Sequence, residues 1–196
     1  MKYIPGVLIA AAAVLALGDA QATTLKVVTV AAPAINCVFD ASCSVIVSDD
    51  LGSLTYAPGT AGPRLQSRTF AAKAGTPGAG KTAYLYRVDL TEPGVITDCL
   101  AGVVLNFGPV AKLNYLPNTP ADIFVVTQGG LGSIGIKSAE QDGDVITFNF
   151  SNYLCAGKTS FFFGLAAVKA PMKSNATVFG IGSPPFVQTT AHVPTH

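Results

Sequence analysis

Apolar residues recur at every second position in many short stretches of this chain, which is the spacing of side chains along one face of a β-strand. Residues 82–91 (TAYLYRVDLT) show it clearly, because Tyr84, Tyr86 and Val88 fall on one face and Leu85 on the other. These stretches are rich in the residue types that favour strands, and no convincing helical period follows the N-terminus. Related stretches occupy residues 25–31, 44–48, 64–73, 103–107, 122–127, 145–150, 160–168 and 176–181.

Turn residues separate these stretches, and the chain has 20 Gly and 13 Pro. Asp142-Gly143 stands just before residues 145–150 and predicts a hairpin turn. About nine to eleven short strands at this spacing are typical of a sandwich of two sheets. We predict an all-β fold, an antiparallel β-sandwich (Ig-like or jelly-roll-like Greek key), as a single domain over residues 23–183. An extended C-terminal tail is predicted for residues 184–196.

The first 22 residues have the three parts of a secretory signal peptide of bacterial type. Lys2 supplies a positive charge, residues 7–17 (VLIAAAAVLAL) are all apolar, and Ala20-Gln21-Ala22 gives the small-x-small pattern of a cleavage site. The apolar run is too short to span a bilayer, which needs about 20 residues. We therefore predict a signal peptide over residues 1–22, no membrane span after signal cleavage, and a secreted or periplasmic protein.

The cysteines form an even set in a chain predicted to be exported, which favours two disulfides. Of the three pairings, we favour Cys37–Cys43, which closes a short local loop, and Cys99–Cys155, which joins two distant strands. A zinc site is the alternative, although the chain lacks a C-x-x-C pair and has no His between these positions. The cysteines are therefore interpreted as structural.

Residues 75–82 read GTPGAGKT and match the phosphate-binding P-loop pattern at Gly75, Gly80, Lys81 and Thr82. In P-loop proteins the lysine contacts phosphate and the hydroxyl binds magnesium. Such a loop must leave a buried strand and open a helix, whereas the residues that follow here alternate as a strand does. Export also removes the protein from free ATP. We interpret the motif as a chance match in a Gly-rich loop, with no cofactor bound there.

Charge and histidine content argue against several functions. Charged residues make up 12% of the chain, against about 25% in ordinary soluble domains, and the formal net charge is +1. A near-neutral chain lacks the basic surface that nucleic-acid binding requires. The histidines, His192 and His196, both lie in the predicted tail, which leaves none in the core for a Ser–His–Asp or Cys–His arrangement.

Acidic residues leave two kinds of chemistry open. Glu140, Asp142 and Asp144 are the candidate calcium ligands, because Ca²⁺ takes oxygen ligands from loops. The same residues also suit an ordinary hairpin turn. Glycoside hydrolysis needs only two carboxylates, so a small secreted glycoside hydrolase is an alternative function.

Aromatic residues are the remaining candidates for binding. Residues 161–163 are three phenylalanines, which cannot all face the core from a strand. This segment must be buried on both faces or form an exposed patch for self-association. Trp is absent, so the tyrosines available to stack on a sugar ring are Tyr56, Tyr84, Tyr86, Tyr115 and Tyr153.

Together these features favour an exported, non-catalytic β-sandwich module. Its predicted role is structural, or the binding of a protein or polysaccharide partner, at the cell surface, in the matrix or in the periplasm. Besides the hydrolase, the alternative is a fimbrial or pilus-like subunit that assembles by strand exchange, which the length and the disulfides suit. The C-terminal stretch (FVQTTAHVPTH) lacks the alternating apolar strand with a Tyr near its end that chaperone-assembled pilins have.

Overall fold

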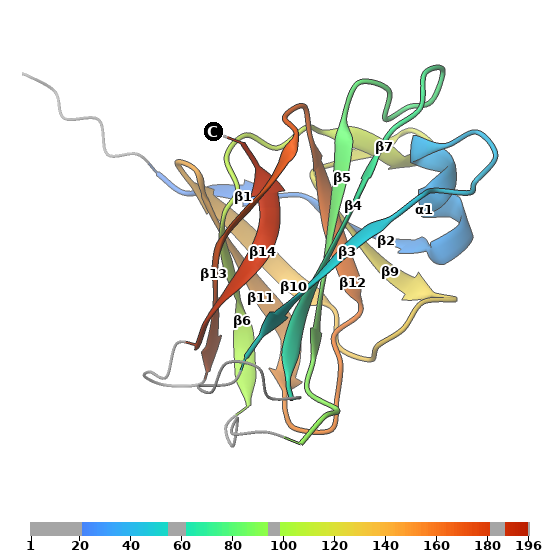
Figure 1. The fold of residues 1–196 in the computed structure, drawn as a ribbon. Coiled ribbons are helices and arrows are strands. Elements are labelled where there is room, and N and C mark those ends of the chain that lie inside the picture. Colours follow the sequence, from blue (N-terminus) through green and yellow to red (C-terminus); the bar gives the residue numbers. More distant parts are fainter. Residues whose placement is uncertain (1–20, 55–61, 94–98, 181–186, 196) are drawn as a thin grey trace, which may run out of the picture.

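The computed structural model describes residues 21–54, 62–93, 99–180 and 187–195. Within these ranges fourteen strands form two six-stranded sheets that pack face to face, together with a separate two-stranded hairpin (Figure 1). The predicted all-β sandwich is confirmed, although the strands outnumber the nine to eleven predicted. Residues 1–20, most of the predicted signal peptide, lie outside the described ranges. No helix inside those ranges is long and apolar enough to cross a membrane.

Sheet A carries the first and the last strand of the described chain at its two edges. Its strands are, in spatial order, β1 (Thr23–Leu25), β10 (Ile136–Asp142), β11 (Val145–Leu154), β6 (Leu100–Asn106), β13 (Pro171–Gly180) and β14 (Val187–Pro194). All neighbouring pairs are antiparallel. Asp142 pairs with Val145, so a two-residue turn with Gly143 at φ 56° closes the predicted hairpin.

Sheet B has five antiparallel strands and one parallel edge strand. Its spatial order is β2 (Val27–Ala31), β9 (Ile123–Gln128), β12 (Phe162–Ala167), β5 (Thr82–Asp89), β4 (Arg64–Ala71) and β3 (Ser48–Ser53). The parallel pair is β2 with β9. The single predicted stretch of residues 25–31 therefore splits, because the chain passes from sheet A to sheet B at Lys26.

The main core lies between the two sheets. On β5, Tyr84, Tyr86 and Val88 are fully buried in this core, and Leu85 belongs to a second cluster on the opposite face. The alternation of residues 82–91 therefore predicts both faces of this strand correctly. Edge-to-face contact of Tyr84 with Phe107, at 5.2 Å between ring centroids, ties β5 to the segment after β6.

A third layer covers the outer face of sheet B. It consists of helix α1 (Ala32–Phe39) and the hairpin of β7 (Leu113–Leu116) and β8 (Thr119–Ala121), seen around the right side of the sandwich in Figure 1. Phe39 of α1 contacts Phe70 edge to face at 5.3 Å and lies 6.4 Å from Phe124. Residues 123–126 of β9 and all of β12 are thus buried on both faces of sheet B, whereas outward side chains of sheet A are half-buried or exposed.

Helix α1 was not predicted, and its presence corrects the expectation of a chain without helices. Its buried residues, Ile35, Val38 and Phe39, have helical spacing, but they span little more than one turn. No side chain caps its N-terminus, no acidic residue lies in the first turn, and Pro33 stands at its second position. Packing against sheet B therefore stabilises the helix more than its local sequence does.

Residues 44–48, predicted as a strand, are also different in the structure. Residues 44–47 have no regular structure, and β3 begins only at Ser48. Ile46 is 88% exposed, so the apolar run does not mark a buried strand here.

The C-terminal residues are a core strand and not a separate tail. Residues 187–194 form β14, which pairs with β13 over its whole length. Val187, Ala191 and Val193 are buried in the main core. His192 consequently lies in the sandwich, where its backbone N–H donates to Ser67 Oγ at 3.0 Å.

The three phenylalanines follow the first of the two predicted alternatives. Phe163 is fully buried in the main core, and Phe162 is buried in the cluster on the outer face of sheet B. The guanidinium groups of Arg68 and Arg87 lie 5.0 and 5.4 Å from the Phe162 ring centroid. No exposed aromatic patch for self-association therefore exists at these residues.

The first and the last strand of the described chain reach the same end of the sandwich, at opposite edges of sheet A. Thr23 of β1 pairs with Gln141 beside the β10–β11 turn, and Pro194 of β14 lines the same pocket as Asp144 of that turn. In Figure 1, β1 and the C-terminal end of β14 both lie in the upper part of the molecule. The β12–β13 turn also reaches this end of the sandwich, through Lys169.

Candidate functional site

The P-loop-like segment packs against the C-terminal end of helix α1. Thr82 begins strand β5, as predicted, and no helix follows the glycines. The backbone N–H of Gly78 donates to Val38 O, and that of Lys73 to Phe39 O, both at 2.8 Å. These carbonyls belong to the last turn of α1, where backbone acceptors lack helical partners. The segment's glycines and turns thus serve to cap α1.

An ion pair reinforces the same contact. Lys73 Nζ lies 2.6 Å from Asp40 Oδ2, directly after α1, and the backbone and hydroxyl of Ser42 donate to Asp40 Oδ1. Lys73 and these hydrogen bonds lower the pKa of Asp40 to about 2. Lys81, which would contact phosphate in a P-loop, places its Nζ 3.5 Å from Ala79 O.

Both preferred disulfides are present. Cys37–Cys43 joins the last turn of α1 to the loop after it, and Cys99–Cys155 joins the start of β6 to the end of β11. The described part of the chain leaves no cysteine unpaired.

The candidate calcium ligands do not form a cluster. Glu140 and Asp142 lie on β10, and Asp144 lies in the turn after it. Among the described residues, no three His, Cys, Asp or Glu side chains gather where they could hold a metal ion. The segment instead forms the hairpin that its turn residues also predicted.

The carboxylates are mostly engaged in ion pairs. Arg68 donates to Asp49 at 2.7 Å and lowers the pKa of that carboxyl. Burial alone would raise the pKa of Asp89, but hydrogen bonds from Thr91 and the charge of Arg87 bring it below its usual value. A general acid in glycoside hydrolysis needs the opposite, a raised pKa. Further ion pairs join Asp50 to Lys173, Glu92 to Arg64 and Asp122 to Lys112.

A polar pocket lies where two neighbouring strands of sheet A have bulges. On β10 the register shifts around Lys137, and on β11 residues 150–153 stand against a single residue of β6, Ala101. Bulges often lie beside functional sites because they redirect side chains. The resulting bulge pocket has a volume of about 450 Å³ and is lined by Ala101, Lys137, Ser138, Asn149, Phe150, Ser151, Asn152 and Tyr153.

The rim of the bulge pocket is fixed by the fold. Cys99–Cys155 closes the far end of the β11 bulge, because it directly follows the Leu154–Leu100 pair. On the other side, Asn149 Nδ2 donates to Ser138 Oγ at 3.2 Å across the two bulged strands. The pocket therefore presents hydroxyl, amide and ammonium groups from a braced scaffold, with no carboxylate in its lining.

The bulge pocket also differs from the rest of the described molecule in having an exposed tyrosine in its lining. Tyr84, Tyr86 and Tyr115 are buried, and Tyr56 lies outside the described residues. Tyr153, in the wall of the bulge pocket, is 51% exposed. Sequence reasoning named Tyr153 as one of five candidates but missed the polar residues around it. The only local signal is that the alternation of residues 145–150 stops at Ser151-Asn152-Tyr153.

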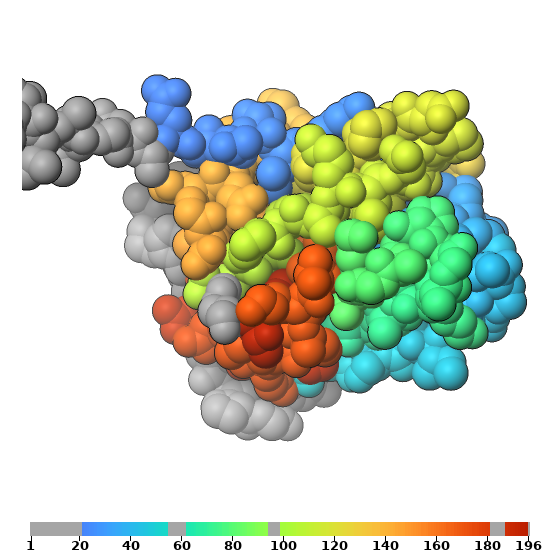
Figure 2. All heavy atoms as spheres, turned by 90° about the horizontal axis from the view of Figure 1, so that it is seen from above, coloured from blue at the N-terminus to red at the C-terminus, as the bar shows by residue number. Residues whose placement is uncertain are grey.

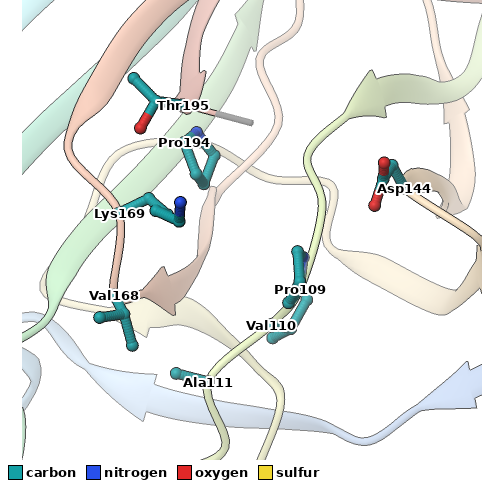
Figure 3. Close-up of a pocket in the computed structure, with 8 residues that line it drawn as sticks. All are labelled: Pro109, Val110, Ala111, Asp144, Val168, Lys169, Pro194 and Thr195. Carbon is teal, nitrogen blue, oxygen red and sulfur yellow. The ribbon is translucent and has the colours of Figure 1, made fainter.

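A second pocket, the end pocket, lies at the end of the sandwich where β14 ends and the β10–β11 and β12–β13 turns lie. In Figure 2, which looks onto this end, the yellow-green segment after β6 crosses between the amber β10–β11 hairpin and the orange-to-red residues of β13 and β14. The pocket has a volume of about 430 Å³, and apolar atoms make up most of its lining. Its lining residues, drawn in Figure 3, are Pro109, Val110, Ala111, Asp144, Val168, Lys169, Pro194 and Thr195.

Comparison with protein-family models, with curated proteins and with solved structures gave no match. The two pockets and the chemistry of their lining residues are the features of this chain that bear on its function.

Proposed function

We propose that this protein is an exported, non-catalytic β-sandwich module that binds a neutral polysaccharide in the bulge pocket. The observation that carries the proposal is the pocket itself, in which the half-exposed Tyr153 stands beside Asn149, Ser151 and Asn152. Sugars offer hydroxyl groups that both donate and accept hydrogen bonds, and amide and hydroxyl side chains match them. Their C–H faces suit an aromatic ring that is apolar over its body and polar at its edge.

The surface around the pocket supports a polymeric ligand. Outward residues of sheet A continue from the pocket as a row of paired neighbours across β10, β11, β6, β13 and β14. This row contains Glu140, Thr147, Val104, Thr177 and Gln188, with Glu140 as its one charged member. A sparsely charged sheet face with no third layer over it fits an extended, uncharged chain. The two disulfides are consistent with the predicted export, since disulfides persist in oxidising compartments.

The test is calorimetric titration of the oxidised mature chain, residues 23–196, with a soluble neutral β-glucan and a neutral α-mannan, and with polygalacturonate as the acidic polymer. We expect one neutral polymer to bind and Tyr153→Ala to weaken that binding at least about tenfold, the scale of one good contact of about 1.4 kcal/mol. Asn149→Ala should weaken it in the same direction. Asn114→Ala, a matched change at an exposed asparagine of β7, should leave it unchanged.

Two results would contradict the proposal. One is failure of all the neutral polymers to bind while the protein stays folded, and the other is equal binding by the Tyr153→Ala and Asn114→Ala variants. Release of reducing sugar, abolished by a single Asp→Asn or Glu→Gln change, would instead support the hydrolase alternative. Strand exchange stays a prediction, and β14, which completes sheet A from the same chain, gives it no support.

A further inference from the structure

The end pocket combines an apolar lining with two opposite charges that have no partner among the described residues. Figure 3 shows Lys169 and Asp144 on opposite sides, with Pro109 and Val110 between them. Each of the two charged residues is exposed, and neither side chain forms an ion pair or a hydrogen bond within the described part of the chain. Asp144 shares this unpaired state with Glu140 and Asp142 of the same hairpin, and of these three residues it is the one that lines the end pocket.

The backbone around both charges is held in place. Asp144 O accepts hydrogen bonds from the N–H groups of Phe107 and Gly108, at 2.7 and 2.9 Å. Lys169 O accepts one from the Tyr84 hydroxyl at 2.7 Å, and Tyr84 is anchored in the main core. The two charged residues are therefore attached to fixed walls, so a ligand that spans them need not reorganise the backbone.

We propose that the end pocket binds a short apolar peptide with free amino and carboxyl termini. Its ammonium group would lie against Asp144 and its carboxylate against Lys169, and its side chains would contact Val110, Val168 and Pro194. A volume of about 430 Å³ lies in the range of small-molecule sites, about 300–1,000 Å³. That size suits a dipeptide. The site is separate from the bulge pocket and does not depend on the proposed polysaccharide binding.

The test is calorimetric titration of the oxidised mature chain at low salt with four dipeptides. Leu-Leu with free termini is the full probe, N-acetyl-Leu-Leu lacks the ammonium group, Leu-Leu-amide lacks the carboxylate, and Gly-Gly lacks the apolar side chains. Each blocked peptide lacks one of the two charge-assisted contacts with the pocket and should bind up to about tenfold more weakly than Leu-Leu, and Gly-Gly should give no measurable binding.

Two substitutions assign the charges to the ends of the peptide. Asp144→Asn should weaken the binding of Leu-Leu about tenfold and leave the binding of N-acetyl-Leu-Leu unchanged. The substitution and the acetylation each remove the same ion pair, so combining them has no further effect. Lys169→Met should also weaken the binding of Leu-Leu about tenfold, and it should leave the affinity for Leu-Leu-amide unchanged. Asp142→Asn and Lys158→Met, at exposed positions outside the pocket, are the matched controls and should leave all affinities unchanged.

The proposal is overturned if Leu-Leu does not bind the folded wild-type protein, or if all three leucine peptides bind with equal affinity. It is equally overturned if Asp144→Asn weakens Leu-Leu and N-acetyl-Leu-Leu by the same factor, since Asp144 would then not contact the ammonium group. Binding of Leu-Leu with the predicted pairing of variants and blocked peptides supports it.

Discussion

Phe39 lies directly against the backbone of Gly78: a Cβ atom at position 78 would come within 2.6 Å of Phe39 Cδ1. The glycine in the middle of the P-loop-like segment is thus required by contact with an aromatic ring of helix α1. This contact and the hydrogen bond from Gly78 N–H to Val38 O give the segment a structural role that needs no nucleotide.

Substitution of Gly78 tests that role. Gly78→Ala should lower the free energy of unfolding by about 1–3 kcal/mol, because the added methyl group overpacks the contact with Phe39. Lys81→Ala should change it by less than about 0.5 kcal/mol, since Lys81 makes only a long contact with Ala79 O. Urea unfolding of both variants measures the difference. A thermal shift of the wild type with Mg·ATP that Lys81→Ala abolishes would contradict the structural interpretation.

Acid should weaken the fold partly through Asp40. Its pKa of about 2 lies below the ordinary value of 3.8 because of Lys73 and Ser42. A carboxyl with a lowered folded pKa stabilises the fold above its unfolded pKa, and this contribution is lost as the pH falls from about 4 toward 2. Asp40→Asn should therefore flatten the fall in unfolding free energy over that interval, measured by urea titrations at successive pH values. Asp142→Asn, an exposed change, should leave the profile as steep as in the wild type.

The two disulfides should contribute unequally to stability. Cys99–Cys155 closes a separation of 56 residues, and Cys37–Cys43 one of 6. Loop entropy gives about 4 kcal/mol for the first and about 2 kcal/mol for the second. The Cys99→Ser/Cys155→Ser double variant should therefore have the lower denaturant midpoint of the two double variants. Equal midpoints would mean that loop entropy does not govern the effect.

Strand β14 should be essential for folding, whereas deletion of a disordered tail would leave the fold intact. Deleting residues 187–196 removes Val187, Ala191 and Val193 from the main core. Each buried valine contributes about 1.5–3 kcal/mol, and the loss of the whole ladder with β13 adds to this against a total stability of about 5–15 kcal/mol. The truncated chain should show no cooperative thermal transition in near-ultraviolet circular dichroism. An unchanged midpoint would show that these residues are dispensable.

A milder variant tests how β14 is held. The Tyr86 hydroxyl donates to the His192 carbonyl oxygen at 2.7 Å. Tyr86→Phe should cost about 1–2 kcal/mol, because it leaves that carbonyl without its donor. Hydrogen exchange of the β14 amides should become faster in this variant, while exchange in β9 and β12 changes less.

The sequence predicts most strands well because the cause of each is local. In β5, alternation of Tyr84, Leu85 and Tyr86 alone indicates which residues face each core. Helix α1 escapes such reasoning because its eight residues are stabilised by partners far along the chain, including Gly78. In β14, Thr189 and Ala191 occupy inward positions and weaken the apolar pattern, so the strand resembles a polar tail.

The pockets were not predictable for a related reason. The bulge pocket exists because residues 150–153 stand against Ala101 alone, which is a property of register between strands far apart in sequence. The end pocket brings together Asp144, Lys169 and Pro194 from three separate turns or strand ends. No local pattern at any one of these positions indicates the others. The cysteine pairing, by contrast, could be predicted from the spacing of the four residues and the expected export.

The position of both chain ends at one end of the sandwich, on opposite edges of sheet A, should govern how the molecule responds to mechanical load. Tension applied through the two ends acts on β1 and β14, the opposite edge strands of sheet A, and pulls them apart sideways. We expect the edge ladders to open successively from that end and not to shear all at once, because the force acts across the strands. The bulge pocket is built from β10, β11 and β6 and is braced by Cys99–Cys155. These strands lie inside the two edge strands, so the bulge pocket would stay intact until β1 and β14 had separated from the sheet.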